Sequence, residues 1–305
     1  MGRILHYLKK FWLQLRSQGW LSTLQTTFQF LWRRKLGLQL ISESIEYHFW
    51  SRYRSISDTL IAKIECKPLE SKRALIYVSF DRESTIRPHV LDQLRFFSGQ
   101  GYDPIFVTTS PCLDSVAIAL LKPFCSLLIH RKNVGYDFAS YRLGYEWLQN
   151  RVSTLESLVV MNDSCIGPLF DFGPHLQQMV AAPGSVYGLT KSLEISEHIQ
   201  SYFYHFGAHV NQSGATKKFF DRIRILESKW AIVRFFEIGS SMLLQREGIH
   251  LRALVDPTES VIAARLQAEG LTEPTREPLA SEWVEQKRLP FKKRSVSQSS
   301  SFNLG

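Results

Sequence analysis

Between residues 73 and 162, short apolar segments of strand character alternate with segments of helical character. The predicted strands cover residues 74–80, 104–108, 126–129 and 157–161, and the predicted helices cover residues 88–98, 114–121 and 137–148. Strands separated by helices pair in parallel, and right-handed crossovers bring their carboxyl ends to one edge of the sheet. We therefore predict an α/β fold with a doubly wound, mostly parallel sheet, extended by a further strand at 185–190.

The fourth predicted strand ends abruptly in the polar sequence Asn162-Asp163-Ser164, shortly before a Gly-Pro pair. A carboxylate in that position lies at the carboxyl edge of the sheet, where open α/β folds bind their ligands. Mg²⁺ or Mn²⁺ on a diphosphate would suit Asp163, because these ions prefer oxygen ligands and the phosphates and water complete their shell. The alternative is that Asn162 and Asp163 only form a turn after the strand.

The turn after the third predicted strand carries a second polar cluster. Gly135 allows the backbone to approach a ligand closely, and Asn133 or Asp137 offers hydrogen bonds to a base or a sugar hydroxyl. Asp137 also suits the N-cap of the helix that follows, and the two roles are compatible. Because both strands end at the same edge, we expect these residues to share one site with Asp163.

Two later segments carry side chains suited to a sugar. Glu237 follows two phenylalanines at the start of a helix predicted for 237–248, after another helix at 221–234. A carboxylate there can act as a general base on a sugar hydroxyl, or it is only a charge favoured by the helix dipole. Hydrogen-bonding groups beside aromatic rings are typical of sugar binding, and the segment 196–206 supplies His198, Gln200 and Tyr202. For His198 the alternative is a structural or surface role, and the histidine spacing fits no zinc signature.

Several functional classes lack a motif in this chain. There is no GxSxG, Walker A or GxGxxG sequence for a hydrolase, a P-loop protein or a classical dinucleotide-binding domain. The four cysteines show no metal-binding spacing and suit a reducing, cytoplasmic compartment. No apolar run approaches the roughly 18 residues that span a bilayer, and the first residues do not resemble a secretory signal.

The net charge of +9 is concentrated in two places. Residues 1–40 contain lysine and arginine but no acidic residue, and a second basic cluster covers residues 287–294. Such charge favours an anionic partner, namely a phospholipid head group, a phosphorylated substrate or nucleic acid, although no nucleic-acid motif accompanies it. Residues 1–60 read as amphipathic helices with interleaved tryptophans, typical of a segment in a membrane interface. A helical pair packed on the domain is the alternative.

Four blocks of the sequence, in combination, resemble the rhamnan synthesis protein F family. The blocks are residues 133–144 (NVGYDFASYRLG), 161–168 (MNDSCIGP), 187–190 (YGLT) and 198–203 (HIQSYF). That family comprises polysaccharide glycosyltransferases of bacterial cell-wall and O-antigen assembly, and the resemblance spans roughly residues 73–255. It implies a GT-A-like fold, whereas the N-terminal helical extension is predicted from the pattern of residues 1–60 alone, which match nothing in the family.

The order of motifs is also similar to that of family 2 glycosyltransferases of the GT-A fold. In the sequences of those enzymes, an Asn-x-Gly motif precedes a helix. A strand that ends in a metal motif follows, and later an aromatic residue precedes the acidic base. By this resemblance Asp163 binds the metal and the nucleotide diphosphate, and Glu237, which follows Phe236, is the base. This chain differs in having one carboxylate in the metal motif, where two are usual.

The resemblance thus implies an inverting glycosyltransferase that moves a sugar, for example rhamnose, from a nucleotide-diphosphate donor to a lipid-linked cell-surface polysaccharide. It would act in the cytoplasm, peripherally at the inner face of the cell membrane, with a divalent metal (Mg²⁺ or Mn²⁺). Asp163 and Glu237 would be catalytic. The donor would be bound by Asn133, Gly135, Asp137, Asn162 and Ser164, and the acceptor by His198, Gln200 and Tyr202.

Two other readings stay open. One is a non-catalytic protein of the same fold that binds a glycan or a nucleotide sugar, and the other is a basic scaffold on a membrane or nucleic acid. The predicted organisation is a basic helical extension (1–65), a GT-A-like domain (73–260), a C-terminal segment (261–288) and a disordered basic, Ser-rich tail (289–305).

Overall fold

The computed structural model describes residues 37–152 and 154–294, and the chain divides into two compact units, Met1–Trp50 and Ser51–Gly305. Within the first unit, residues 37–48 form a helix. The amphipathic helices predicted before residue 37 lie outside the described residues. In the described ranges, no helix has the length and apolar character needed to cross a membrane.

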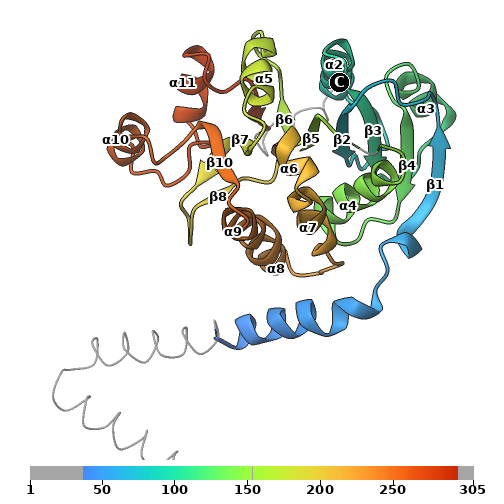
Figure 1. Cartoon of the computed structure of the whole chain (residues 1–305), viewed down its shortest axis with the longest axis horizontal. Helices are drawn as coiled ribbons and strands as arrows, with labels where there is room; N and C mark the ends of the chain where they lie inside the picture. Colours follow the sequence, from blue (N-terminus) through green and yellow to red (C-terminus); the bar gives the residue numbers. More distant parts are fainter. Residues whose placement is uncertain (1–36, 153, 295–305) are drawn as a thin grey trace, which may run out of the picture. The chain divides into compact units, whose positions relative to one another are not determined.

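Nine strands of the described chain form one sheet in the second unit, in the order β1-β4-β3-β2-β5-β9-β7-β10, with β8 paired to β7 (Figure 1). Their bounds are β1 Leu60–Glu65, β2 Arg73–Ser79, β3 Asp103–Thr108, β4 Leu127–Arg131, β5 Ser157–Asn162, β7 Ser185–Ser192, β8 His198–Ile199, β9 Phe203–Gly207 and β10 His250–Val255.

The central strands β4, β3, β2 and β5 are all parallel, and β7 and β10 form a second parallel pair. Strand β9 lies antiparallel between β5 and β7, and β1 is antiparallel at the edge. The predicted α/β class, with a doubly wound and mostly parallel sheet, is confirmed. Strands β2 to β5 and β7 occupy the predicted segments, whereas β1, β8, β9 and β10 were not predicted.

Helices cover both faces of the sheet, with α2 and α5 on one face and α4, α7 and α9 on the other (Figure 1). The described helices are α2 Pro88–Gly99, α3 Ser115–Leu121, α4 Tyr136–Gln149, α5 Gly173–Val180, α6 Ala208–Gln212, α7 Ala215–Asp221, α8 Lys229–Ile232, α9 Gly239–Arg246, α10 Ser260–Ala268 and α11 Leu279–Glu285, with 3₁₀ turns at Trp50–Tyr53 and Ser57–Thr59.

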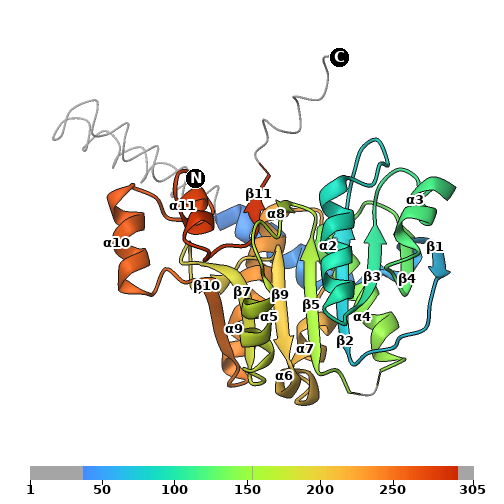
Figure 2. The same cartoon turned by 90° about the horizontal axis from the view of Figure 1, so that it is seen from above.

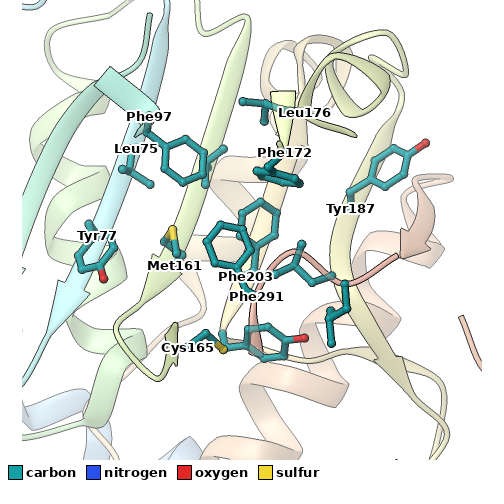
Figure 3. Close-up of a cluster of buried hydrophobic side chains, with 14 of the residues drawn as sticks. Leu75, Tyr77, Phe97, Met161, Cys165, Phe172, Leu176, Tyr187, Phe203 and Phe291 are labelled. Carbon is teal, nitrogen blue, oxygen red and sulfur yellow. The ribbon is translucent and has the colours of Figure 1, made fainter. Parts of the chain in front are cut away.

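An aromatic cluster fills the core between the sheet and the layer that contains α2 and α5 (Figure 3). Phe172 lies at its centre, with ring centroids 6.4 Å from Phe97, 6.1 Å from Phe203 and 5.3 Å from Phe291. Phe291 comes from the far C-terminal part of the chain and is buried there. The segment beyond residue 288 therefore helps to build the core.

This corrects the expectation of a disordered tail over residues 289–294. Leu289 and Phe291 are each 1% exposed. Strand β11 (Lys292–Lys293) pairs antiparallel with β6 (Cys165–Ile166) in a separate two-stranded sheet. Figure 2 shows β11 near the tip of the arrow of β5, at the carboxyl edge of the main sheet. These two hydrophobic residues anchor the otherwise basic segment 289–294 to the core. Residues 295–305 lie outside the described residues.

Candidate active site

The carboxylate of Asp163 is fixed at the carboxyl edge of the sheet by the neighbouring strand end. Its Oδ2 atom accepts hydrogen bonds from the Ser79 hydroxyl at 2.7 Å and from the Phe80 backbone N–H at 3.1 Å. Within the described chain, no hydrogen bond reaches Oδ1. Burial raises the pKa of Asp163, whereas these hydrogen bonds and the charges of Arg294 and His89 lower it. One oxygen is thus held in place, while the other has no hydrogen-bond partner within the described chain.

Asn162 links the end of β5 to the first turn of α4. Its side-chain Nδ2 donates to Asp137 Oδ2 at 2.8 Å, and its Oδ1 accepts from the Ser164 hydroxyl at 2.5 Å. The predicted N-cap role of Asp137 is wrong, because Gly135 occupies the N-cap in a left-handed conformation with φ 74°. The carboxylate of Asp137 therefore joins the candidate site and does not cap the helix.

Three carboxylates converge here, although they come from distant parts of the sequence. Burial raises the pKa of Asp137 to about 6, against the hydrogen bond from Asn162, and the charges of Asp163 and Glu237 raise it further. The same three carboxylates, with burial as the largest cause, raise the pKa of the Tyr141 hydroxyl. Contacts link the three residues: Asn162, next to Asp163, donates to Asp137, and the Tyr141 hydroxyl of α4 donates at 3.2 Å to the carbonyl of Ser201, whose hydroxyl donates to Glu237.

The pKa of Asp137 predicts a pH-dependent effect on stability. Since the unfolded chain titrates near the ordinary value of about 3.9, the folded state binds more protons between about pH 4 and 6, and stability falls as pH rises through that window. The Asp137→Asn variant keeps an acceptor for Asn162 but carries no charge. We expect its free energy of unfolding to exceed that of the wild type by on the order of 1 kcal/mol at pH 8, with the advantage disappearing near pH 4.

Urea unfolding in metal-free buffer at several pH values measures this difference. A gap between Asp137→Asn and wild type that does not change with pH would contradict the expectation, as would a more stable wild type at pH 8.

Glu237 lies in a π-helical segment between α8 and α9. Its carboxylate accepts a hydrogen bond from the Ser201 hydroxyl, and His198 Nε2 lies 3.9 Å from its Oε2 atom. The rings of Phe236 and Phe138 pack at a centroid distance of 5.4 Å, which joins this segment to α4. Glu237 is therefore positioned against the first turn of the helix that carries Asp137.

The predicted start of a helix at Glu237 is wrong. The two helices expected at 221–234 and 237–248 are replaced by a helical segment that begins only after residue 228. It runs without a break through α8 (Lys229–Ile232), the π-helix (Val233–Ile238) and α9 (Gly239–Arg246). Single-turn π segments occur frequently at functional sites, and this one sets the direction of the Glu237 side chain.

Asn133 and Gly135 lie on a pocket of their own. It has a volume of about 560 Å³ and is lined by Arg54, Asn133, Val134, Gly135, Tyr136, Ile225, Leu226 and Glu227. The chain passes so close to Gly135 that a Cβ atom there would lie 3.3 Å from Ile225 Cα. Its positive φ and this close approach explain why glycine is needed at position 135.

Arg131 holds the 132–135 turn in place and was not singled out from the sequence. Its fully buried guanidinium donates hydrogen bonds to the Ser140 hydroxyl at 2.8 Å, to the Thr59 hydroxyl at 3.1 Å and to the Val134 carbonyl. Burial lowers its pKa to about 10, and the nearby charge of Asp137 opposes this. Arg131 thereby connects the 3₁₀ turn Ser57–Thr59, the 132–135 turn and α4.

The three side chains predicted to bind the acceptor are all buried. Gln200 Oε1 and the Tyr202 hydroxyl both contact the Thr190 hydroxyl, at 2.5 and 2.7 Å. His198 Nδ1 lies 2.8 Å from the Ser196 carbonyl oxygen, with its other ring nitrogen toward Glu237. Gln200 and Tyr202 form a polar network within the protein, and their role in acceptor binding stays a prediction.

Comparison with known proteins decides the family. The model of the family described as rhamnan synthesis protein F matches residues 105–303, which is well over half of the chain. The chain belongs to the rhamnan synthesis protein F family. The matched region includes Asp137, Asp163 and Glu237, and it extends through the C-terminal segment that completes the core.

Curated relatives match at lower identity. The uncharacterized protein y4gN of Sinorhizobium fredii is 26% identical over 197 residues, which cover 63% of this chain and 51% of that protein. The virulence protein VirA of Vibrio anguillarum is 29% identical over 134 residues, 43% of this chain and 42% of that protein. The chain therefore spans about half the length of the curated relatives it matches.

Among solved structures, a Desulfovibrio desulfuricans protein assigned as a nucleotide-diphospho-sugar transferase aligns with 64% of this chain and 96% of its own. The alignment has 9% identity and a TM-score of 0.38.

The residues at the edge of the sheet offer limited support for a metal ion. In residues 37–152 and 154–294, no group of three or more His, Cys, Asp or Glu side chains is arranged to hold one. One carboxylate is nevertheless sufficient when phosphate oxygens and water supply the other ligands, and Oδ1 of Asp163 is available for that purpose. The donor set fits an ion that arrives together with a diphosphate.

Proposed function

We propose that this protein is an inverting glycosyltransferase that uses a nucleotide-diphosphate sugar, with the diphosphate at Asp163 and Glu237 as the general base. Membership of the rhamnan synthesis protein F family supports a glycosyltransferase-like function. The observation that carries the proposal is the set of hydrogen bonds that connects Asp137, the Asn162-Asp163 strand end and Glu237 at the carboxyl edge of the sheet, where α/β folds bind ligands.

In this mechanism Glu237 takes the proton from an acceptor hydroxyl as its oxygen attacks the anomeric carbon of the donor sugar. The bond between that carbon and the diphosphate oxygen breaks, and its electron pair leaves with the nucleoside diphosphate. One displacement of this kind inverts the configuration. The Ser201 hydroxyl and His198 hold the carboxylate of Glu237 in position.

Asp163 is the residue that would hold a divalent metal, Mg²⁺ or Mn²⁺. Such an ion neutralises the charge that develops on the leaving diphosphate. Asn162 positions Asp137 beside Asp163, and the 133–137 turn would contact the nucleotide or the sugar through Asn133, Gly135 and Asp137. Ser164 supports the same edge through its hydrogen bond to Asn162.

The acceptor in this proposal is a lipid-linked cell-surface polysaccharide, and the transferred sugar is rhamnose from a dTDP donor. His198, Gln200 and Tyr202 would contact the acceptor. The basic and aromatic segment before residue 60 would keep the enzyme at the inner face of the membrane, because each cation near an anionic surface contributes about 1 kcal/mol.

A thermal-shift experiment with a panel of nucleoside diphosphates and nucleotide sugars tests the donor site. At a concentration about 100-fold above Kd, a ligand that binds only the native state stabilises it by roughly 2.7 kcal/mol. We expect a shift with one nucleotide that increases with Mn²⁺ and is lost in Asp163→Ala. The control is Asp92→Ala, which removes an exposed carboxylate paired with Arg95 on α2.

The absence of any shift in the wild type would contradict the proposal. A shift that survives in Asp163→Ala would place the nucleotide elsewhere. The single carboxylate in the metal motif favours one second candidate, a non-catalytic protein that binds a glycan or a nucleotide sugar at the same site. Such a protein would retain glycan binding without Glu237, whereas the enzyme would lose turnover.

A further inference from the structure

The C-terminal strap (residues 289–294) is anchored directly beside the end of β5. Leu289 and Phe291 are buried in the core, and the Leu169 N–H donates to the Pro290 carbonyl at 2.8 Å. After the pairing of β11 with β6, the Arg294 N–H donates to the Ser164 carbonyl at 2.9 Å. The backbone of the strap thus runs alongside the residue that follows Asp163.

This anchoring brings Arg294 beside Asp163 and Lys293 beside Tyr202, whose carbonyl accepts a hydrogen bond from the Asn162 N–H at 3.3 Å. Arg294 Nη1 lies 3.5 Å from the Asp163 carbonyl oxygen, and Lys293 Nζ lies 5.2 Å from the ring centroid of Tyr202. Among the ion pairs of the described chain, neither side chain has a carboxylate partner. Lys292 differs, because its Nζ forms an ion pair with Glu277 at 2.5 Å.

Lys293 and Arg294 lie next to a site whose metal motif has a single carboxylate. Because neither cation has an acidic partner among these ion pairs, both can bind a phosphate. A diphosphate carries at least two negative charges, and cations bound to phosphate form strong, charge-assisted hydrogen bonds. Charge increases on the leaving diphosphate during sugar transfer, so a fixed cation stabilises the transition state more than the ground state.

We propose that the C-terminal strap is part of the donor site and that Lys293 and Arg294 bind the diphosphate of the nucleotide donor. This inference rests on the proposed function and extends it. It assigns to the donor site a positive charge that the metal motif alone does not supply. Lys293 is exposed and Arg294 is half-buried, so both side chains can be replaced without opening the core.

The test compares Lys293→Met, Arg294→Met and the double variant with the matched control Lys292→Met. The probes are the nucleoside diphosphate selected by the wild type, the corresponding monophosphate and the uncharged nucleoside, titrated by calorimetry. We expect Kd for the diphosphate to rise about tenfold for each single variant and about 100-fold for the pair. Nucleoside binding and the Lys292→Met control should remain unchanged.

The outcomes separate this inference from the proposed function. If the wild type binds no nucleoside diphosphate, the proposed function fails. If the wild type binds and the double variant binds equally well, the strap inference alone is overturned. A loss of affinity for the nucleoside equal to that for the diphosphate would also overturn it, because it would show a loss of structure and not of charge.

A second pair of variants covers the case in which the double variant is less stable without ligand. Lys293→Arg and Arg294→Lys keep both charges, so we expect them to bind the diphosphate within about threefold of the wild type. A 100-fold loss in these charge-conserving variants would overturn the inference. Diphosphate affinity of the wild type should also fall more steeply with salt than that of the double variant.

Discussion

The Glu237→Gln variant is expected to lose 10²- to 10⁴-fold in turnover while it binds the donor nucleotide as tightly as the wild type. Glutamine has nearly the same shape and can still accept the hydrogen bond from Ser201, but it cannot take a proton from the acceptor hydroxyl. Transfer of radiolabelled sugar to a membrane extract measures turnover, and thermal shift with the donor nucleotide measures binding.

The matched control for this experiment is Glu247→Gln, which removes a carboxylate that pairs with Lys218 at the end of α9. It should transfer sugar at the wild-type rate. Turnover in Glu237→Gln within threefold of the wild type would exclude Glu237 as the base. If the variant lost nucleotide binding as well, Glu237 would have a structural role in the donor site.

The Gly167→Ala variant is expected to lower the free energy of unfolding by about 3 kcal/mol. Gly167 has a φ of 146°, and a Cβ atom at this position would lie 2.4 Å from the Pro290 carbonyl oxygen and 2.8 Å from Phe291 Cδ1. The C-terminal strap would have to move away. Exposure of a buried leucine or phenylalanine side chain costs about 1.5–3 kcal/mol, and Leu289 and Phe291 would both be affected. Denaturant unfolding measures the loss.

Gly99→Ala is the control for this variant. A Cβ atom at Gly99 meets nothing within 4 Å, and the residue is the last of helix α2. Alanine there should leave stability unchanged or increase it slightly. A Gly167→Ala protein whose stability lies within 0.5 kcal/mol of the wild type would show that the strap tolerates the added atom.

The part of the fold that sequence patterns predicted is the part built from local signals. Strands β2, β3, β4 and β5 are short apolar runs, and the helices between them start with recognisable residues such as Pro88 and Asp114. The right-handed crossover rule then places the carboxyl ends of these strands at one edge of the sheet. This is why the parallel centre of the sheet was predicted.

Long-range pairing explains what the patterns missed. Strand β1 has exposed and half-buried residues only, so it carries no apolar run, and it pairs with β4 through backbone hydrogen bonds. The strap is basic and looks disordered by composition, yet Phe291 packs against Phe172, more than a hundred residues away in the sequence. Its two buried hydrophobic residues are too few to stand out from the charges around them.

In the candidate site, too, local sequence patterns predicted some features, and features that depend on long-range contacts were missed. Asp163 and Asn162 were found because a strand ends there, and Asp137 because it follows a turn. The Ser79 hydroxyl that fixes Asp163 belongs to a strand 84 residues earlier, and no local pattern indicates its role. The π-helix at Glu237 also has no sequence signature, so its residue was found while the backbone around it was assigned incorrectly.

The position of the strap also sets an order in time. Asp163 and Arg294 are 131 residues apart in the sequence. At a synthesis rate of about 5–20 residues per second, roughly 7 to 26 s pass between the translation of the two residues. During that interval the nascent sheet can form, but its carboxylates lack the cations of the strap and Phe172 lacks its partner Phe291. The core and the donor site would then be completed together, late in the synthesis of the protein.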